Sequence, residues 1–182
     1  MKKVIFLFLA IFSIVNFANS QITKGTWLLS GNASFSMIKY GSDGSVKYKQ
    51  TNLSISPSVG YFLVDKFALG LRPSLTYGST SISNGNSETI FTVGPFLRYY
   101  LLNTDRVFNI LTEGSYSFLS LKNSGTKQNT FSLAGGPVLY FNPSVGLEFL
   151  IGYASTKVVN YAGTNNEIRF SIGFQFNLEN EE

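Results

Sequence analysis

The sequence contains no histidine and no cysteine, and these two absences remove much of the side-chain chemistry that enzymes use. Without histidine there is no Ser-His-Asp triad, no imidazole base and no histidine metal ligand. Without cysteine there is no disulfide, no thiolate nucleophile, no cysteine zinc site and no lipid-modified N-terminal cysteine. We therefore expect a protein that is not an enzyme and has no catalytic, cofactor-binding or metal site.

Charge is also sparse, since charged residues make up 13% of the chain and the formal net charge is +4. Two of the positive charges, Lys2 and Lys3, lie at the N-terminus, so the rest of the chain carries only +2. The remaining lysines and arginines are scattered singly, without a basic cluster. This distribution predicts no nucleic-acid partner.

Long apolar runs are absent after the first twenty residues. Lys2 and Lys3 precede an apolar core at residues 4–15, and Ala18-Asn19-Ser20 places small residues at a cleavage site. The core is short of the ~20 residues that a membrane-spanning helix needs. The pattern predicts a cleaved signal peptide at residues 1–20.

The rest of the chain alternates apolar residues with small or polar ones. In the last segment one face carries Ile168, Phe170, Ile172, Phe174, Phe176 and Leu178. The opposite face carries Glu167, Arg169, Ser171, Gly173, Gln175 and Asn177. A period of two over this length indicates a β-strand.

Eight segments show this alternation, and we expect an all-β fold, an eight-stranded antiparallel up-and-down transmembrane β-barrel at residues 21–178. A short acidic tail, residues 179–182, follows it. Only a closed barrel lets such strands cross a bilayer, because lipid offers no partner for unpaired backbone groups. The expected strands are residues 26–40, 49–62, 67–77, 88–101, 107–121, 129–141, 145–155 and 167–178.

The connections between these strands alternate in length. Tight turns alternate with longer polar loops, which is typical of outer-membrane barrels. The long loops are expected at residues 41–48, 78–87, 122–128 and 156–165. Aromatic residues near the strand ends predict two interfacial girdles. Toward the loops they are Tyr40, Tyr77 and Tyr153, and toward the turns they are Trp27, Tyr61, Tyr99, Tyr100 and Phe176.

Volume decides which face points outward. The apolar face carries about five bulky residues per strand. The interior of an eight-stranded barrel is narrow and is just wide enough to be filled by side chains. Packing all the bulky residues inside would overfill it, so we expect the apolar face to meet lipid. The weakest points of the strand assignments are prolines inside the strands. They are Pro57, Pro73, Pro95 and Pro137.

Five of the charges inside the expected strands fall on the small-residue face and are expected to form a charge network in the lumen. They are Arg72, Arg98, Glu113, Glu148 and Arg169. Arg98 and Glu113 lie on neighbouring strands and are the favoured pair. Together with serine, threonine and asparagine they predict a lumen filled by polar and charged side chains. A proton or ion path is the alternative interpretation of the same residues.

The terminal segment at residues 171–178 carries Ser171, Gly173, Phe176 and Leu178 in the spacing of the β-signal read by the barrel assembly machinery. With the signal peptide, the eight strands and the loop asymmetry, the chain resembles the small outer-membrane β-barrel family that includes OmpX and the transmembrane domain of OmpA. The resemblance implies a bacterial outer-membrane location and the assembly machinery as a partner during biogenesis. It does not imply a common activity.

These observations favour an integral outer-membrane protein without enzyme activity, with a structural or surface-interaction role through its long loops. Its expected partners are outer-membrane lipid and a surface or envelope protein. Two alternatives stay open at this point: an accessory component of an envelope secretion or assembly complex, and a soluble calycin-like barrel that binds an apolar ligand.

Overall fold

A computed structural model describes residues 22–42, 45–80, 87–103, 107–120, 127–159 and 163–178. The expected signal peptide and the acidic tail lie outside these residues. The strands are β1 (Trp27–Ser42), β2 (Ser45–Val64), β3 (Phe67–Thr80), β4 (Ser87–Tyr100), β5 (Phe108–Ser120), β6 (Lys127–Asn142), β7 (Val145–Val158) and β8 (Thr164–Leu178). Among the described residues, the structure contains no helix with the length and apolar character needed to span a bilayer.

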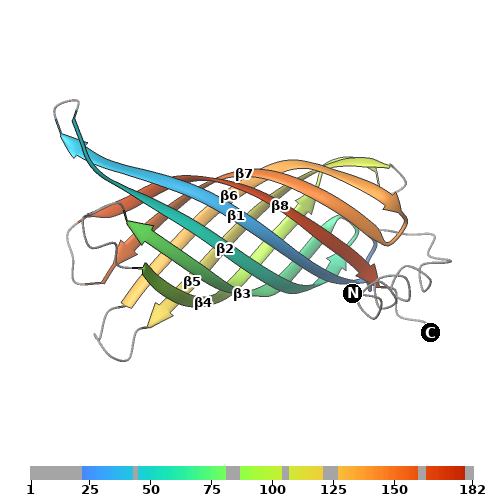
Figure 1. The fold of residues 1–182 in the computed structure, drawn as a ribbon. Coiled ribbons are helices and arrows are strands. Elements are labelled where there is room, and N and C mark those ends of the chain that lie inside the picture. The colour runs from blue at the N-terminus through green and yellow to red at the C-terminus, as the bar shows by residue number, and fades with distance from the viewer. Residues whose placement is uncertain are drawn as a thin grey trace, which may run out of the picture.

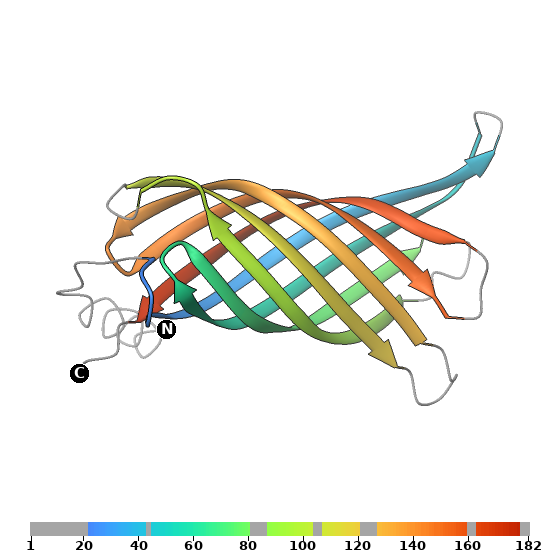
Figure 2. The same ribbon diagram turned by 180° about the vertical axis from the view of Figure 1, so that it is seen from behind.

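The eight strands close into one barrel in chain order, and β8 pairs with β1 (Figures 1 and 2). All neighbouring pairs are antiparallel. Trp27 pairs with Leu178, so the sheet begins and finishes at the end of the barrel that carries the tight turns. We call this the turn end and the opposite one the loop end. The predicted all-β, eight-stranded, up-and-down barrel is confirmed.

Prolines interrupt three of the strand ladders. The pairing of β2 with β3 is broken where Pro57 lies opposite Pro73. The ladders between β4 and β5 and between β6 and β7 are broken at Pro95 and at Pro137. Proline has no N–H to donate, so each one leaves a gap in the ladder without ending the strand.

Two of these gaps are also places of close backbone approach. A Cβ added at Gly94 would lie 1.8 Å from the backbone oxygen of Tyr116, and one at Gly136 would lie 2.0 Å from that of Phe149. Gly94 directly precedes Pro95, and Gly136 directly precedes Pro137. The Gly-Pro pairs therefore let neighbouring strands pass closer together than any other residue would allow.

The register sets the shear of the barrel. A path of register partners that starts at Arg98 on β4 and passes once around the barrel returns to β4 at Glu88, ten residues nearer the loop end. With about 3.3 Å per residue and about 4.8 Å between strands, this shear tilts the strands by about 41° from the barrel axis. That value lies in the range of transmembrane barrels.

The strands are longer at the loop end than the sequence suggested. The expected loop 41–48 is wrong, because β1 and β2 continue as a paired hairpin to Ser42 and Ser45. Beyond Ser36, β1 has no register partner on β8, so the hairpin projects past the rest of the barrel (Figure 1). At this end β3, β4, β6, β7 and β8 also extend one to three residues further than expected, whereas β5 ends one residue earlier. Polar strand ends have no buried face that would reveal them in the sequence.

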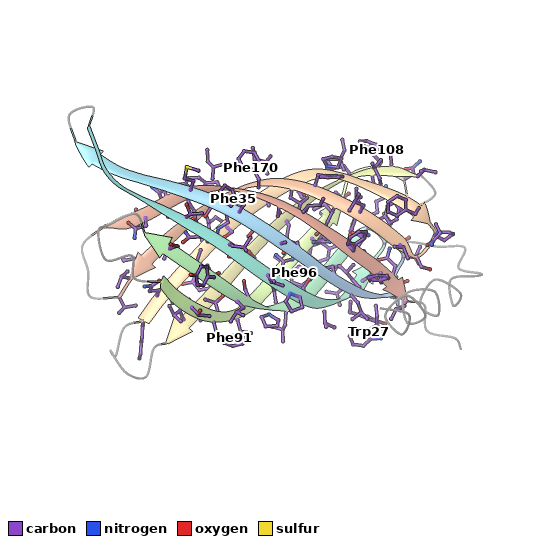
Figure 3. The ribbon with its side chains drawn as sticks, in the orientation of Figure 1. Trp27, Phe35, Phe91, Phe96, Phe108 and Phe170 are labelled. Atoms are coloured by element: carbon purple, nitrogen blue, oxygen red, sulfur yellow. The ribbon has the colours of Figure 1, made fainter. Side chains whose placement is uncertain are left out.

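The apolar face of the strands points outward, as predicted. Exposed examples from successive strands are Leu29, Ile55, Leu71, Phe91, Tyr116, Leu133, Ile151 and Phe170. Figure 3 shows Phe91, Phe108 and Phe170 projecting away from the barrel wall. Tyr100 is a correction to the predicted girdle, because alternation along β4 turns it into the lumen, where it is fully buried. The side chain of Tyr40 lies outside the described part of the chain.

The interior is not uniformly polar, which corrects the expected filling. A buried apolar cluster occupies the part toward the turn end. It comprises Ile22, Leu28, Phe62, Ala68, Phe96, Tyr100, Leu111, Val138, Tyr140 and Leu150. The part toward the loop end is an open polar cavity. The lumen charges lie between these two regions.

Candidate functional site

Arg98 is the centre of a buried charge cluster in the lumen. Its side chain is 0% exposed and contacts two carboxylates. Its Nη1 donates to Oε2 of Glu148 at 2.7 Å, and its Nε and Nη2 donate to Oε2 of Glu113 at 3.0 and 2.7 Å. Glu113 is the direct register partner of Arg98 on β5, whereas Glu148 reaches it from β7.

Glu113 is shared with a second arginine. Arg72 on β3 places both terminal nitrogens on this carboxylate, with Nη2 2.6 Å from Oε2 and Nη1 on Oε1. Such paired contacts match the planar geometries of guanidinium and carboxylate. Arg72 and Arg98 thus balance the charges of Glu113 and Glu148, and the cluster is neutral as a whole.

A chain of uncharged side chains extends the cluster toward the turn end. The Tyr100 hydroxyl donates to Oε1 of Gln175 at 2.8 Å, and Nη1 of Arg98 lies 3.3 Å from the same oxygen. Nε2 of Gln175 donates to the hydroxyl of Tyr140 at 2.8 Å. These additions join β6 and β8 to the cluster, which therefore cross-links six of the eight strands.

An aromatic ring packs against both guanidinium groups. The ring centroid of Phe96 lies 4.7 Å from Cζ of Arg72 and 5.8 Å from that of Arg98. Figure 3 labels this residue, which is almost fully buried, in contrast to the outward phenylalanines. A desolvated cation over a ring face is attracted by the ring quadrupole, so Phe96 helps to hold the two arginines in place.

Arg169 is not part of this cluster, which corrects the five-residue network expected from the sequence. Its Nε donates to Oε1 of Glu167 at 2.5 Å, and its side chain is 38% exposed. Oε2 of Glu167 accepts from the hydroxyl of Ser36 at 2.7 Å. Glu167 and Arg169 form a separate ion pair on the wall of the loop-end cavity.

The shear explains this separation. Because the barrel steps by ten residues over eight strands, each strand raises the register path by about 1.25 residues toward the loop end. On β7 the position level with Arg98 therefore falls near Glu148, although its register path arrives at Gly152. On β8 the path arrives at Arg169, about five residues or roughly 12 Å above the level of Arg98.

The loop-end cavity has a volume of about 390 Å³. Its wall consists mainly of serine, threonine and asparagine, with Arg72 and Glu113 at its inner end and Glu167 and Arg169 on its side. Many of its hydroxyls pair across neighbouring strands, for example Thr130 with Thr156 at 2.8 Å. A polar space of this size holds on the order of ten waters, which suits a hydrated vestibule.

The geometry of the cluster favours a barrier over a reactive site. Glu113 and Glu148 are buried, and although Glu113 borders the inner end of the loop-end cavity, the oxygens of both carboxylates already accept from arginine nitrogens. Replacing a buried ion pair by apolar residues is often neutral, but removing one partner costs about 3–5 kcal/mol. The cluster therefore fixes how the strands meet across the lumen and closes the space between them.

Four residues of the site were not predicted from the sequence: Phe96, Tyr100, Tyr140 and Gln175. A signal for three of them was present, because Phe96, Tyr100 and Gln175 are large side chains on an otherwise small-residue face. Continuing the alternation of β6 past Gly136 places Tyr140 on the same face. Large residues that break the pattern of a narrow lumen mark the layer where it is filled.

The segment expected to act as an assembly signal forms the end of β8. Leu178 is exposed on the outer wall, and Ser171 lines the loop-end cavity. A Cβ at Gly173 would lie 2.7 Å from the backbone oxygen of Gly31. This glycine is therefore needed by the closed barrel itself, where β8 meets β1, whatever else it does.

The described residues contain no group of three or more histidine, cysteine, aspartate or glutamate side chains placed to hold a metal ion. No protein-family model matches the chain, and no curated protein matches it. The solved structures similar to it include bacterial surface and outer-membrane proteins.

Neisserial surface protein A is 15% identical, with 84% of this chain and 97% of that one covered, at a TM-score of 0.56. OprG from Pseudomonas aeruginosa is 16% identical, with 87% of this chain and 98% of that one covered, at a TM-score of 0.49. The N-terminal barrel domain of OprF from the same organism is 14% identical, with 85% of this chain and 98% of that one covered, at a TM-score of 0.45. At such identities the likeness concerns the fold alone. The chain has the fold of the small eight-stranded outer-membrane β-barrels.

Proposed function

We propose that this protein is an integral outer-membrane β-barrel of a bacterial envelope, without enzyme activity, and that it has a structural or surface-interaction role through its loop end. The observation that carries the proposal is the outer wall. Large apolar side chains cover it from every strand, and many of them are about half exposed.

An apolar wall of this extent suits hydrocarbon and not water. Monomeric soluble proteins rarely expose contiguous apolar patches above a few hundred Å². A soluble barrel that binds an apolar ligand would carry these side chains inside, where this barrel has a charge cluster and a polar cavity. The outward direction of the apolar side chains therefore argues against the calycin-like alternative.

The absence of enzyme activity is supported by the state of the lumen carboxylates. Glu113 and Glu148 both contact Arg98 in a closed layer, and the chain has no histidine or cysteine to act with them. General acid–base catalysis needs a group within hydrogen-bond reach of the substrate. In the buried cluster each carboxylate oxygen already accepts from an arginine nitrogen.

Recovery from a Gram-negative host tests this proposal. We expect the protein in the outer-membrane fraction, with a folded form that migrates differently from the heated form on a gel. Purified protein that stays folded and monodisperse in buffer without detergent would contradict a lipid-facing wall.

The assembly machinery is proposed as a partner that reads residues 171–178. Leu178→Ser tests this, because Leu178 is exposed and contributes little to the folded interior. We expect loss of assembly in cells while refolding into detergent is unchanged. The matched control, Leu75→Ser on the outer face of β3, should assemble normally. Equal behaviour of the two variants in cells would rule out a signal role for Leu178. Gly173 is unsuitable for this test, because its substitution also disturbs the closed barrel.

A further inference from the structure

A short segment before the first strand is folded against the turn end of the barrel. Residues 22–26 do not belong to the sheet, yet their backbone is fixed by it. The N–H of Gly25 donates to the carbonyl of Phe62 at 3.0 Å, and the N–H of Phe62 donates to the carbonyl of Thr26 at 3.0 Å. We call residues 22–26 the strap.

The strap is also tied to the turn between β2 and β3. The N–H of Lys66 donates to the carbonyl of Ile22 at 2.9 Å, and the N–H of Lys24 donates to Oδ1 of Asp65 at 2.8 Å. The carbonyl of Lys66 in turn accepts from the N–H of Tyr100 at 2.9 Å, which links the turn to β4. Lys66 has φ +68°, a left-handed conformation that costs a non-glycine residue about 1–2 kcal/mol.

Ile22 is the residue that these bonds position. Its side chain is 0% exposed and belongs to the apolar cluster that lumen-facing residues form at the turn end. That cluster includes Leu28 of β1 and Val138 of β6, so the side chains with which Ile22 is grouped come from different sides of the barrel. Fully burying an isoleucine side chain is worth about 1.5–3 kcal/mol, which holds the strap in place.

We propose that the strap is a plug that closes the turn end of the lumen, in addition to the Arg98 cluster. Water and small uncharged hydrophilic solutes then reach the loop-end cavity only from the loop end, and the cavity is a blind vestibule. The apolar space between the cluster and Ile22 stays dry. The inference concerns the path through the barrel and holds wherever in the envelope the protein resides.

The natural absence of cysteine allows a direct test with single-cysteine variants of the full chain, folded in detergent. Ala68→Cys places a thiol in the buried cluster behind the plug, and Ser117→Cys places one in the loop-end cavity. The probe is N-ethylmaleimide, which is small and uncharged. With the strap intact, we expect the cysteine at position 68 to react at least about tenfold more slowly than the cysteine at position 117, because only local opening of the barrel exposes position 68.

The plug is then removed by Ile22→Ser, with Ile22→Leu as the matched apolar control. We expect Ile22→Ser to raise the reaction rate at position 68 by about tenfold or more and to leave the rate at position 117 unchanged. Ile22→Leu should change neither rate. Migration of each variant as the folded form on an unheated gel shows that the barrel is still folded.

A second pair of variants displaces the strap without touching the buried side chain. Gly25 has φ +91°, and a Cβ there would meet only the Tyr61 hydroxyl, at an ordinary contact distance of 3.9 Å, so Gly25→Val acts mainly by straining the strap backbone. Gly163 at the loop end has φ +129° and nothing within 4 Å, so Gly163→Val is its control. We expect only Gly25→Val to raise the rate at position 68. The proposal is overturned if position 68 reacts as fast as position 117 with the strap intact, or stays protected in both strap variants.

Discussion

Removing the central guanidinium by Arg98→Met is the most informative perturbation of the lumen. Arg98 is buried and contacts both carboxylates, and it is the ion-pair partner of Glu148 among the described residues. Methionine keeps most of the volume but leaves Glu148 as a buried charge without a counter-ion. Breaking a buried pair from one side costs about 3–5 kcal/mol, so we expect the free energy of unfolding to fall by that amount.

The matched control is Arg169→Met. Arg169 also contacts a carboxylate on the lumen face, but its side chain is 38% exposed at the loop-end cavity. Exposed ion pairs contribute about 0–1 kcal/mol, so this variant should lose less than about 1 kcal/mol. The comparison holds the substitution constant and contrasts a fully buried arginine between two carboxylates with a partly exposed arginine on one.

Equilibrium unfolding by urea in phospholipid vesicles measures both losses. Trp27, the single tryptophan, lies on the outer wall against Tyr61 with ring centroids 5.1 Å apart, and its fluorescence reports transfer between lipid and water. Adding Glu148→Leu to Arg98→Met should recover part of the loss, because it removes the uncompensated carboxylate. Equal losses for Arg98→Met and Arg169→Met would refute the assignment of Arg98 to a desolvated layer.

Two further predictions concern the strand wall and its facing. Gly94→Ala should prevent closure of the barrel or cost at least about 3 kcal/mol, because the new Cβ meets the backbone of Tyr116; Gly114→Ala, whose nearest neighbour is a side chain at 3.6 Å, should migrate as the folded form on an unheated gel. Leu97→Arg on the outer wall should cost up to the ~2–4 kcal/mol of a mid-depth arginine and impair insertion into vesicles, whereas Ser115→Asn in the cavity wall should be mild. A larger loss for Ser115→Asn than for Leu97→Arg would mean that the lipid-facing and lumen-facing sides of the strands are assigned wrongly.

The period of two in the sequence determined the strands and their facing. Each apolar face was visible from residue types alone, and the volume argument that turned Leu97 outward and Arg98 inward agrees with the structure. The number of strands and their antiparallel order followed from the same alternation and from the spacing of the turns. These features depend on residues that are close together in the chain, so the sequence alone is enough to predict them.

Strand ends at the loop side were harder to place. The hairpin of β1 and β2 continues through residues expected in a loop, because polar residues on a solvated strand have no buried face to mark them. Likewise, nothing in the pattern of residues 22–26 indicated that Ile22 returns to the lumen. Its burial depends on backbone bonds to a turn about forty residues away.

Which lumen residues meet was decided only by the closed structure. The sequence placed Arg98, Glu148 and Arg169 on the lumen face. Alternation does not give the position of a residue along the barrel axis, which is set by the shear. A shear of ten brings Glu148 level with Arg98 across the lumen and carries Arg169 away toward the loops. Alternation is a property of each strand alone, whereas the shear exists only once β8 has paired with β1.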